Sequence, residues 1–126
     1  MVPKDLRYTK EHEWVRVEGD MATVGITEFA SEQLGDIVFV ELPEIGRTVT
    51  QFAAVGVIES VKAVSDLFAP LTGEVVESNS ELSTAPELLN SDPFGKGWML
   101  RMRVDDAAQV GALLDAAAYE ALTSEA

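Results

Sequence analysis

The amino-acid sequence predicts a β-dominated α+β domain, and three observations lead to this prediction. Short runs of strand-forming residues recur along most of the chain, with turn residues about every eight to twelve positions. A helical period interrupts these runs once, early in the chain, and returns only after the last strand. No long linker or low-complexity segment divides the 126 residues. We therefore expect a single domain, residues 1–126, built as a small sandwich or barrel.

The first half of the chain predicts a hairpin, a short helix and a further strand. Residues 14–17 alternate apolar and polar side chains, and a turn at 18–20 leads to a partner strand at 22–26. Residues 27–35 change to a helical period, with a threonine that can cap the start and a glycine that can end the helix. Residues 37–42 form a strand, which a proline stops.

The second half predicts a long hairpin region, a last strand and a helical C-terminal segment. A short strand at 48–49 precedes the hairpin region, which covers about residues 53–77. The strands of this region are 53–60, 63–70 and 74–77. After a loop at 91–97 and a strand at 98–104, aspartates can cap two short helices within about residues 105–122.

The charge balance limits the kinds of partner. The sequence has 22 Asp and Glu against 9 Lys and Arg, a formal net charge of −13. Such a chain repels phosphate backbones and anionic lipid, so we expect neither nucleic acid nor a membrane as partner. The sequence has no run of about eighteen apolar residues that could cross a bilayer. The acids are spread along the chain and predict either a self-repelling surface or an acidic face that docks on basic partners.

The N-terminal residues 1–15 mix charged and apolar side chains. This mixture matches neither a signal peptide nor an Arg-rich transit peptide, so we expect a bacterial cytoplasmic protein. A mature organelle matrix protein cloned with a new methionine would have the same sequence features. The sequence does not encode the oligomeric state, and a monomer is the expectation.

Side chains typical of catalytic and metal sites are sparse. The sequence has no cysteine and one histidine, His12, so a Ser-His-Asp triad would depend on this single residue. A lone histidine beside a strand is more often structural. The sequence lacks HExxH, Walker A and GxGxxG motifs and the EF-hand spacing, while its abundant acids leave a paired-carboxylate site open. We predict a carrier or adaptor without a metal rather than an enzyme.

One of the four lysines differs from the others in its surroundings. Lys62 lies between two apolar strand segments, at or beside the tip of the hairpin they form. The other three, in polar, turn-like or terminal sequence, are Lys4, Lys10 and Lys96. The tip has no Asn-Gly or Asp-Gly pair to favour a turn. An exposed lysine at a turn is common, but a lysine held clear of the domain can also be acylated and carry a tethered group.

Six stretches of the sequence occur in the order and spacing of one known family. They are YTKEHEWV at 8–15, GITEFA at 25–30, LGDIVFVELP at 34–43, ESVKAVSDL at 59–67, APLTGEV at 69–75 and LNSDPFG at 89–95. In these stretches the chain resembles the glycine cleavage system H proteins. The resemblance covers nearly the whole length and shows no departure at Lys62.

The resemblance implies a fold, a cofactor and a set of partners. The fold is a lipoyl-domain-like barrel-sandwich hybrid with a short internal helix and a C-terminal helical segment. Lys62 matches the lysine whose amine carries lipoate in an amide bond. The carrier takes the aminomethyl group of glycine from a pyridoxal-phosphate glycine decarboxylase to a tetrahydrofolate-dependent aminomethyltransferase. A flavin-containing dihydrolipoamide dehydrogenase then reoxidises it, so the hard chemistry belongs to the cofactors of these enzymes.

The residues beside the lysine are the expected recognition site for the enzyme that attaches lipoate. This enzyme is a lipoate ligase or a lipoyl or octanoyl transferase, and it must select one lysine of four. Glu59 and Ser60 precede the lysine and are candidates for this recognition. Val61 and Ala63 flank it as compact neighbours that leave the amine accessible.

A pocket for the loaded arm is the last expectation. An aminomethyl amine is cationic near neutral pH and labile in water, so it would gain from a carboxylate in a cleft that limits water. Glu13 is the first candidate for this carboxylate by resemblance, followed by Asp66 and then Glu11. Each of them can also be an ordinary surface acid.

Other functions also use an acylated lysine. Biotin acceptors usually place methionines on both sides of the lysine, where this chain has Val61 and Ala63. Lipoyl domains of 2-oxoacid dehydrogenases are shorter and joined to long linkers. A lipoate donor in lipoyl relay to those domains would use the same Lys62, so the sequence leaves this alternative open. An unmodified docking module is the remaining alternative, and the intact lysine motif argues against it.

Overall fold

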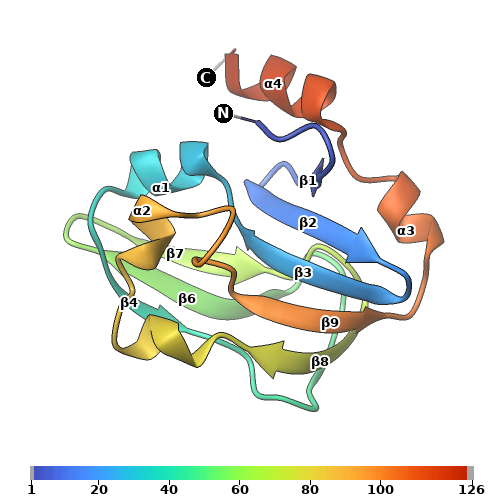
Figure 1. Cartoon of the computed structure of the whole chain (residues 1–126), viewed down its shortest axis with the longest axis horizontal. Helices are drawn as coiled ribbons and strands as arrows, with labels where there is room; N and C mark the ends of the chain where they lie inside the picture. Colours follow the sequence, from blue (N-terminus) through green and yellow to red (C-terminus); the bar gives the residue numbers. More distant parts are fainter. Residues whose placement is uncertain (1, 125–126) are drawn as a thin grey trace.

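In residues 2–124, which the computed structural model describes, the β-strands form two antiparallel sheets (Figure 1). The strands are β1 (Arg7–Tyr8), β2 (Glu13–Glu18), β3 (Met21–Ile26), β4 (Ile37–Glu41), β5 (Thr48–Val49), β6 (Ala54–Ser60), β7 (Val64–Phe68), β8 (Gly73–Ser78) and β9 (Leu100–Val104). The helices are α1 (Glu28–Leu34), the 3-10 helix η1 (Ser80–Ser83), α2 (Leu88–Ser91), α3 (Ala108–Gly111) and α4 (Ala116–Ser124). The predicted β-dominated α+β class is confirmed.

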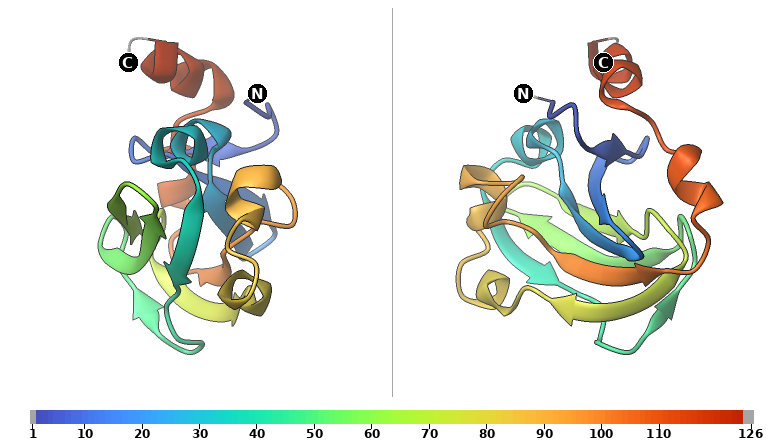
Figure 2. Two further views of the ribbon diagram at one scale, coloured as in Figure 1. Left: turned by 90° about the vertical axis from the view of Figure 1, so that its left-hand side faces the viewer. Right: turned by 45° about the vertical axis from the view of Figure 1, so that its right-hand side comes forward.

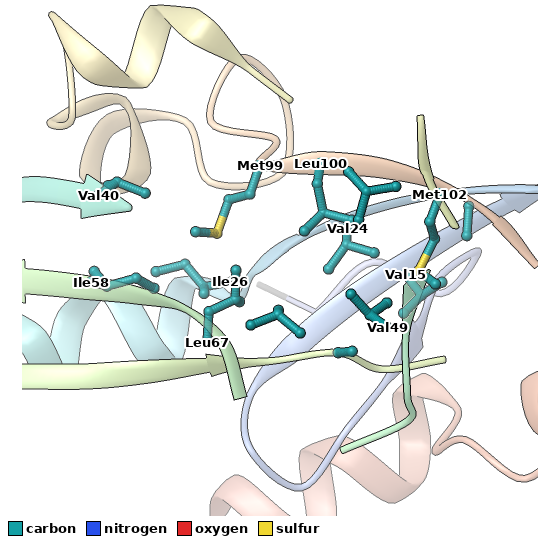
Figure 3. Close-up of a cluster of buried hydrophobic side chains, with 14 of the residues drawn as sticks. Val15, Val24, Ile26, Val40, Val49, Ile58, Leu67, Met99, Leu100 and Met102 are labelled. Atoms are coloured by element: carbon teal, nitrogen blue, oxygen red, sulfur yellow. The ribbon is translucent and has the colours of Figure 1, made fainter. Parts of the chain in front are cut away.

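The two sheets wrap around a common apolar interior (Figure 2). One sheet has six strands in the order β1-β2-β3-β9-β8-β5, and the other has three in the order β4-β6-β7. Alternate side chains of each strand point to the same side of a sheet. Apolar side chains from both sheets therefore meet inside, among them Val24, Ile58, Leu67 and Met102, each at most 2% exposed (Figure 3).

The β2–β3 hairpin depends on one glycine. Trp14 on β2 is fully buried and lies opposite Gly25 on β3, and its Nε1 donates a hydrogen bond to the Pro93 carbonyl at 2.8 Å. A Cβ at position 25 would come within 2.6 Å of the Trp14 ring. The missing side chain of Gly25 therefore makes room for the indole on the neighbouring strand.

The C-terminal segment is fastened to the first strand. The backbone groups of Tyr8 and Leu114 exchange two hydrogen bonds, at 2.8 and 2.9 Å, and the rings of Tyr8 and Tyr119 stack with centroids 4.6 Å apart. Both tyrosines belong to a second apolar cluster, together with Trp14 and Ala116. This cluster lies outside the main core and holds α4 against the N-terminal strands.

The expected hairpin region at 53–77 proves too long. Only β6 and β7 pair as a hairpin, whereas β8 pairs with β5 and β9 in the other sheet. The chain leaves the hairpin at Ala69 and Leu71, whose side chains are buried in the core. Pro70, between them, lacks the N–H that a continuing strand would use. The strand predicted at 63–70 therefore ends early, at Phe68.

The predicted helices are present with the expected caps. Thr27 Oγ1 accepts a hydrogen bond from the Ala30 N–H, and α1 ends at Gly35, which has a φ of 78°. Asp115 Oδ1 accepts from the Ala118 N–H in the same way at the start of α4. At α3 the N-cap position is Ala107, and Asp106 Oδ1 binds the Ala108 N–H from one residue earlier. The short elements β1, η1 and α2 carry no pattern that predicts them. Within residues 2–124, none of these helices has the length and apolar character needed to span a bilayer.

Candidate functional site

Lys62 lies in the turn that joins β6 to β7, which projects at the left of Figure 1. The Ser60 N–H donates to the Ala63 carbonyl at 2.8 Å, which closes the turn. Ser60 Oγ accepts hydrogen bonds from the backbone N–H groups of Ala63, at 3.0 Å, and Lys62, at 3.3 Å. The serine hydroxyl thus stabilises a turn that has no turn-favouring dipeptide. It accepts hydrogen bonds from two backbone N–H groups that would otherwise have no partner in the turn.

The tip is also held from the neighbouring strand. The Val61 N–H donates to the Asp36 carbonyl at 3.0 Å. Asn90 fixes the backbone on both sides of Asp36, since its Oδ1 accepts from the Ile37 N–H at 2.9 Å and its Nδ2 donates to the Gly35 carbonyl at 2.7 Å. Asn90 therefore positions the carbonyl that binds the tip, although it lies far from Lys62 in the sequence. It falls within the LNSDPFG stretch, the one signal that could have indicated it.

The Lys62 side chain is exposed and has room around it. Its neighbours Val61 and Val64 are 69% and 68% exposed, and its Cε lies 3.5 Å from the position that a Cβ on Gly35 would take. Neither of the ion pairs seen within residues 2–124 includes Lys62. The remaining lysines, Lys4, Lys10 and Lys96, all lie in turns outside the two sheets. Lys62 is thus the lysine presented on a strand-supported tip, with its amine accessible for acylation.

The other recognition candidates surround this lysine. Val61 and Ala63 are exposed on either side of it, and Ser60 is buried beneath the turn. Glu59 lies at the end of β6, half-buried, and its register neighbours are Phe39 on β4 and Val64 on β7. An approaching enzyme can therefore reach Glu59, Val61 and Ala63 directly, while Ser60 acts by setting the shape of the turn.

Glu13, the first residue of β2, has a buried carboxyl that lies against the end of β7 remote from the tip. It is 2% exposed, and it accepts hydrogen bonds from Thr9 Oγ1 and, at 3.3 Å, from the Phe68 N–H. Burial raises the pKa of Glu13 to about 7, and the negative charge of Glu11 adds to the rise, against the opposing effect of the two hydrogen bonds. Near neutral pH this carboxyl exists in both its protonated and its charged form.

A cavity of about 410 Å³ is lined in part by Phe68, the residue whose N–H binds this carboxyl. Its lining residues come from the start of the chain, from the position just before β6, from the end of β7 and from the C-terminal segment. The lining residues are Tyr8, Lys10, Glu11, Phe52, Phe68, Ala112, Leu113 and Leu114. The sequence did not indicate its two phenylalanines, of which Phe52 has a φ of 67° in an exposed turn.

The three predicted pocket acids take different positions. Glu11 lines the cavity, and Glu13 lies behind Phe68, which forms part of the wall. Asp66 is exposed on β7, two residues from Phe68 and therefore on the same side of the strand. Along β7, the side chains of Val64, Asp66 and Phe68 mark a path of about 13 Å from the tip end of the strand to the cavity. The acids thus lie along one route rather than in a single cluster.

His12 has a structural role in this geometry. Its Nδ1 lies 2.8 Å from Tyr119 Oη, which also lies 2.7 Å from Thr27 Oγ1. Burial lowers the pKa of His12, so the neutral ring can accept the tyrosine hydrogen. Burial likewise raises the pKa of Tyr119 to about 12, so this hydroxyl keeps its proton. Within residues 2–124, His12 and the acids form no group of three or more that could hold a metal ion.

Two facing antiparallel sheets with an exposed lysine on a hairpin tip define the lipoyl-domain-like barrel-sandwich hybrid. The family model described as "Glycine cleavage H-protein" matches residues 6–126. The chain therefore belongs to the glycine cleavage H-protein family.

Individual relatives agree with the family match. The glycine cleavage system H protein of Symbiobacterium thermophilum is 58% identical over 124 residues, which cover 98% of this chain and 97% of the relative. That of Beutenbergia cavernae is 60% identical over 123 residues, 98% of this chain and 97% of the relative. The crystal structure of a glycine cleavage system H protein from Mycobacterium marinum superimposes with a TM-score of 0.90 at 41% identity, covering 98% of this chain and 99% of that one.

Proposed function

We propose that the protein is a lipoyl-lysine carrier of the glycine cleavage system, with lipoate in amide linkage to Lys62. It accepts an aminomethyl group at a pyridoxal-phosphate glycine decarboxylase and delivers it to a tetrahydrofolate-dependent aminomethyltransferase. A flavin-containing dihydrolipoamide dehydrogenase then restores the oxidised arm. The observation that supports this most strongly is the exposed Lys62 on its serine-braced tip, in a chain of the H-protein family. Its bacterial relatives favour a bacterial cytoplasmic location.

The residues around Lys62 fit an acylated lysine. Gly35 offers no side chain beside the lysine stem, and no carboxylate forms an ion pair that would hold the amine back, as far as residues 2–124 show. Bound lipoate supplies a disulfide that can take up a one-carbon unit and be reoxidised. The chain contributes the placement of the amine, because the bonds from Ser60 and Asp36 hold the tip in one shape. Recognition by the attaching enzyme then falls to Glu59, Val61 and Ala63.

The arm pocket is part of the same proposal. The path over Val64 and Asp66 leads from the tip to the cavity, where Glu11 is the lining carboxylate. A cationic amine held there lies near the buried Glu13 carboxyl and would favour its charged form. Phe52 and Phe68 supply apolar walls that limit water around the amine. Docking in the cavity should therefore strengthen as the pH rises through about 7, the pKa of Glu13.

Mass spectrometry after enzymatic lipoylation tests the carrier proposal. The chain is incubated with lipoate, ATP and a lipoate ligase, and its intact and peptide masses are measured. We expect one lipoyl group, on Lys62, with none on Lys62→Ala and normal modification of a matched Lys10→Ala variant. No gain of mass, or a gain spread over the other three lysines, would contradict the proposal.

A second assay separates glycine cleavage from lipoate relay. The lipoylated chain is incubated with glycine and the purified decarboxylase, aminomethyltransferase and tetrahydrofolate, and formation of the folate product is followed. Product formation supports the carrier role. Transfer of labelled lipoate to a dehydrogenase lipoyl domain, in place of folate product, would assign the chain to relay.

A further inference from the structure

The tip that carries Lys62 depends on a contact outside its own hairpin. The turn between β6 and β7 has three residues beyond the paired strands, Val61, Lys62 and Ala63. Ser60 Oγ accepts hydrogen bonds from the N–H groups of the last two. The Val61 N–H instead donates to the Asp36 carbonyl at 3.0 Å. The first N–H of the turn is therefore held by the segment that joins α1 to β4.

Strand pairing is irregular where the Asp36 carbonyl leaves the sheet. Asp36 lies between the end of α1 and Ile37, the first residue of β4. The pairing of β4 with β6 shifts register just after this point, between Ile37 and Phe39. A register shift of this kind disrupts the ladder locally, so the peptide unit that joins Asp36 to Ile37 needs another group to orient it.

Asn90 orients this peptide unit. Its Oδ1 accepts from the Ile37 N–H at 2.9 Å, and its Nδ2 donates to the Gly35 carbonyl at 2.7 Å. The Ile37 N–H and the Asp36 carbonyl belong to one planar peptide unit and point in opposite directions. The hydrogen bond to Asn90 on one edge of this plane therefore aims the carbonyl on the other edge at the Val61 N–H. The two bonds also polarise each other, since the peptide unit donates at one end and accepts at the other.

The same segment supports the side chain of the lysine. Gly35 ends α1 with a φ of 78°, a value that glycine adopts without strain. A Cβ at this position would lie 3.5 Å from Lys62 Cε and 3.9 Å from Lys62 Cδ. The lysine stem thus lies against the residue whose carbonyl Asn90 holds. The backbone of the tip and the direction of the stem both depend on the placement of residues 35–37.

We propose that Asn90 is a positioning residue for the acylation of Lys62, acting through the Asp36 carbonyl and the Val61 N–H. The inference rests on the proposed carrier function, since it concerns the step that attaches the arm. In that step the neutral Lys62 amine attacks the activated carboxyl carbon of lipoate, a C–N bond forms, and the activating nucleotide and one amine proton leave. Asn90 binds the backbone of residues 35 and 37, away from these atoms, and keeps the tip in the shape that presents the amine.

Loss of the Asn90 amide should lower the population of this shape without abolishing it. The Ser60 hydroxyl still closes the turn, and the recognition candidates beside the lysine keep their side chains. An enzyme that binds one shape of the tip then binds more weakly, in proportion to the fraction of molecules in that shape. We therefore expect KM for the chain to rise, while kcat, which describes the bound tip, stays nearly unchanged.

Hydrogen exchange of the unmodified chain tests the link without any enzyme. Asn90→Ala is compared with Asn79→Ala, the matched control. Asn79 is buried and also holds loop backbone, because its Nδ2 donates to the carbonyls of Lys96 at 2.9 Å and Trp98 at 2.7 Å. We expect the Val61 N–H to exchange about tenfold faster in Asn90→Ala and at the wild-type rate in Asn79→Ala. Unchanged exchange of this N–H in Asn90→Ala would overturn the proposal.

Lipoylation kinetics test the consequence. KM and kcat of each chain are measured with purified lipoate ligase, and urea unfolding gives the stability of each variant. We expect Asn90→Ala to raise KM about tenfold with kcat within about twofold of wild type. Asn79→Ala should lose comparable stability and keep both constants within about twofold. A similar KM for the two variants would overturn the proposal, because the effect would then follow stability alone. Absence of acylation in wild type would instead count against the proposed function.

A backbone replacement tests the route through the tip. Replacing Val61 by α-hydroxyvaline turns its N–H into an ester oxygen and keeps its side chain, so the tip loses the bond to Asp36. This replacement alone should raise KM about tenfold. Adding Asn90→Ala should then change KM by less than about twofold, since the bond through which Asn90 acts is already gone. Multiplied effects of the two changes would show that Asn90 acts by another route, and would overturn the proposal.

Discussion

The two ends of strand β7 differ in how they are held. At the tip, Lys62 and its neighbours are exposed, and the turn depends on Ser60 and a few backbone bonds. At the other end, Leu67 and Ala69 are buried and the Phe68 N–H is bound by the buried Glu13. The hairpin is therefore anchored at its base and open at its tip. A carrier needs this arrangement, because the base supplies the stability while the tip remains available to several enzymes.

The largest expected difference between the two ends comes from removing apolar side chains. Leu67→Ala at the anchored end should lower the free energy of unfolding by about 2–5 kcal/mol, since it empties a fully buried site. Val61→Ala at the tip should change it by less than about 0.5 kcal/mol, because that side chain is 69% exposed. Urea unfolding of both variants checks this. Comparable losses at the two positions would show that the tip is as firmly packed as the base.

The next effect is the pH dependence of the anchored end. The pKa of Glu13 is raised from 4.5 to about 7 in the folded protein, so the folded state holds a proton that the unfolded chain has released. The free energy of unfolding should therefore fall as the pH rises from about 4.5 to about 7, by on the order of 3 kcal/mol, and level off above.

Glu13→Gln isolates this contribution. In the variant, the free energy of unfolding should lack the decline that Glu13 causes between pH 4.5 and 7. The difference in this free energy between wild type and variant should therefore change over that pH range. His12 has a lowered pKa, and its contribution is lost as the pH falls, but it is present in both proteins and cancels in the difference. Urea titrations at a series of pH values provide the measurement. A pH-independent difference would refute the assignment to Glu13.

A smaller loss is expected from the hydroxyl that fastens the C-terminal helix. Tyr119→Phe keeps the stacking on Tyr8 but leaves His12 and Thr27 without their shared partner. We expect a loss of about 1–2 kcal/mol in the free energy of unfolding, with lipoylation at Lys62 unchanged. A lower rate of lipoylation in Tyr119→Phe would contradict this expectation, and would show that the packing of α4 affects the hairpin tip.

A modest loss of stability is expected from the serine hydroxyl beneath the tip. Ser60→Ala removes the hydroxyl that binds the Lys62 and Ala63 N–H groups and should lower the free energy of unfolding by about 1 kcal/mol. Its kcat/KM in the lipoylation assay should fall more steeply, about tenfold, because the turn loses its fixed shape. Ser65→Ala on β7 is the matched control and should change neither quantity. Normal lipoylation of Ser60→Ala would show that the turn keeps its shape without the hydroxyl.

The sequence predicted the tip better than the pocket. Lys62 stands out because strands flank it, and strand patterns are local features that the sequence shows directly. The cavity is made by Glu11, Phe52, Phe68 and Leu113, which come from distant segments, and only the tertiary fold brings them together. The burial of Glu13 was equally hidden, since an acid at the start of a strand is ordinarily exposed. The end of the hairpin was misplaced because Ala69 and Leu71 are apolar without continuing the strand.

The buried carboxyl of Glu13 has a consequence for calorimetry. With a pKa of about 7, roughly half of the molecules carry its proton in a neutral buffer. A cation that docks beside this carboxyl expels the proton, so binding releases up to about half a proton per molecule to the buffer. The apparent binding enthalpy then depends on the ionisation enthalpy of the buffer, and titrations in phosphate and in Tris give different heats for the same event.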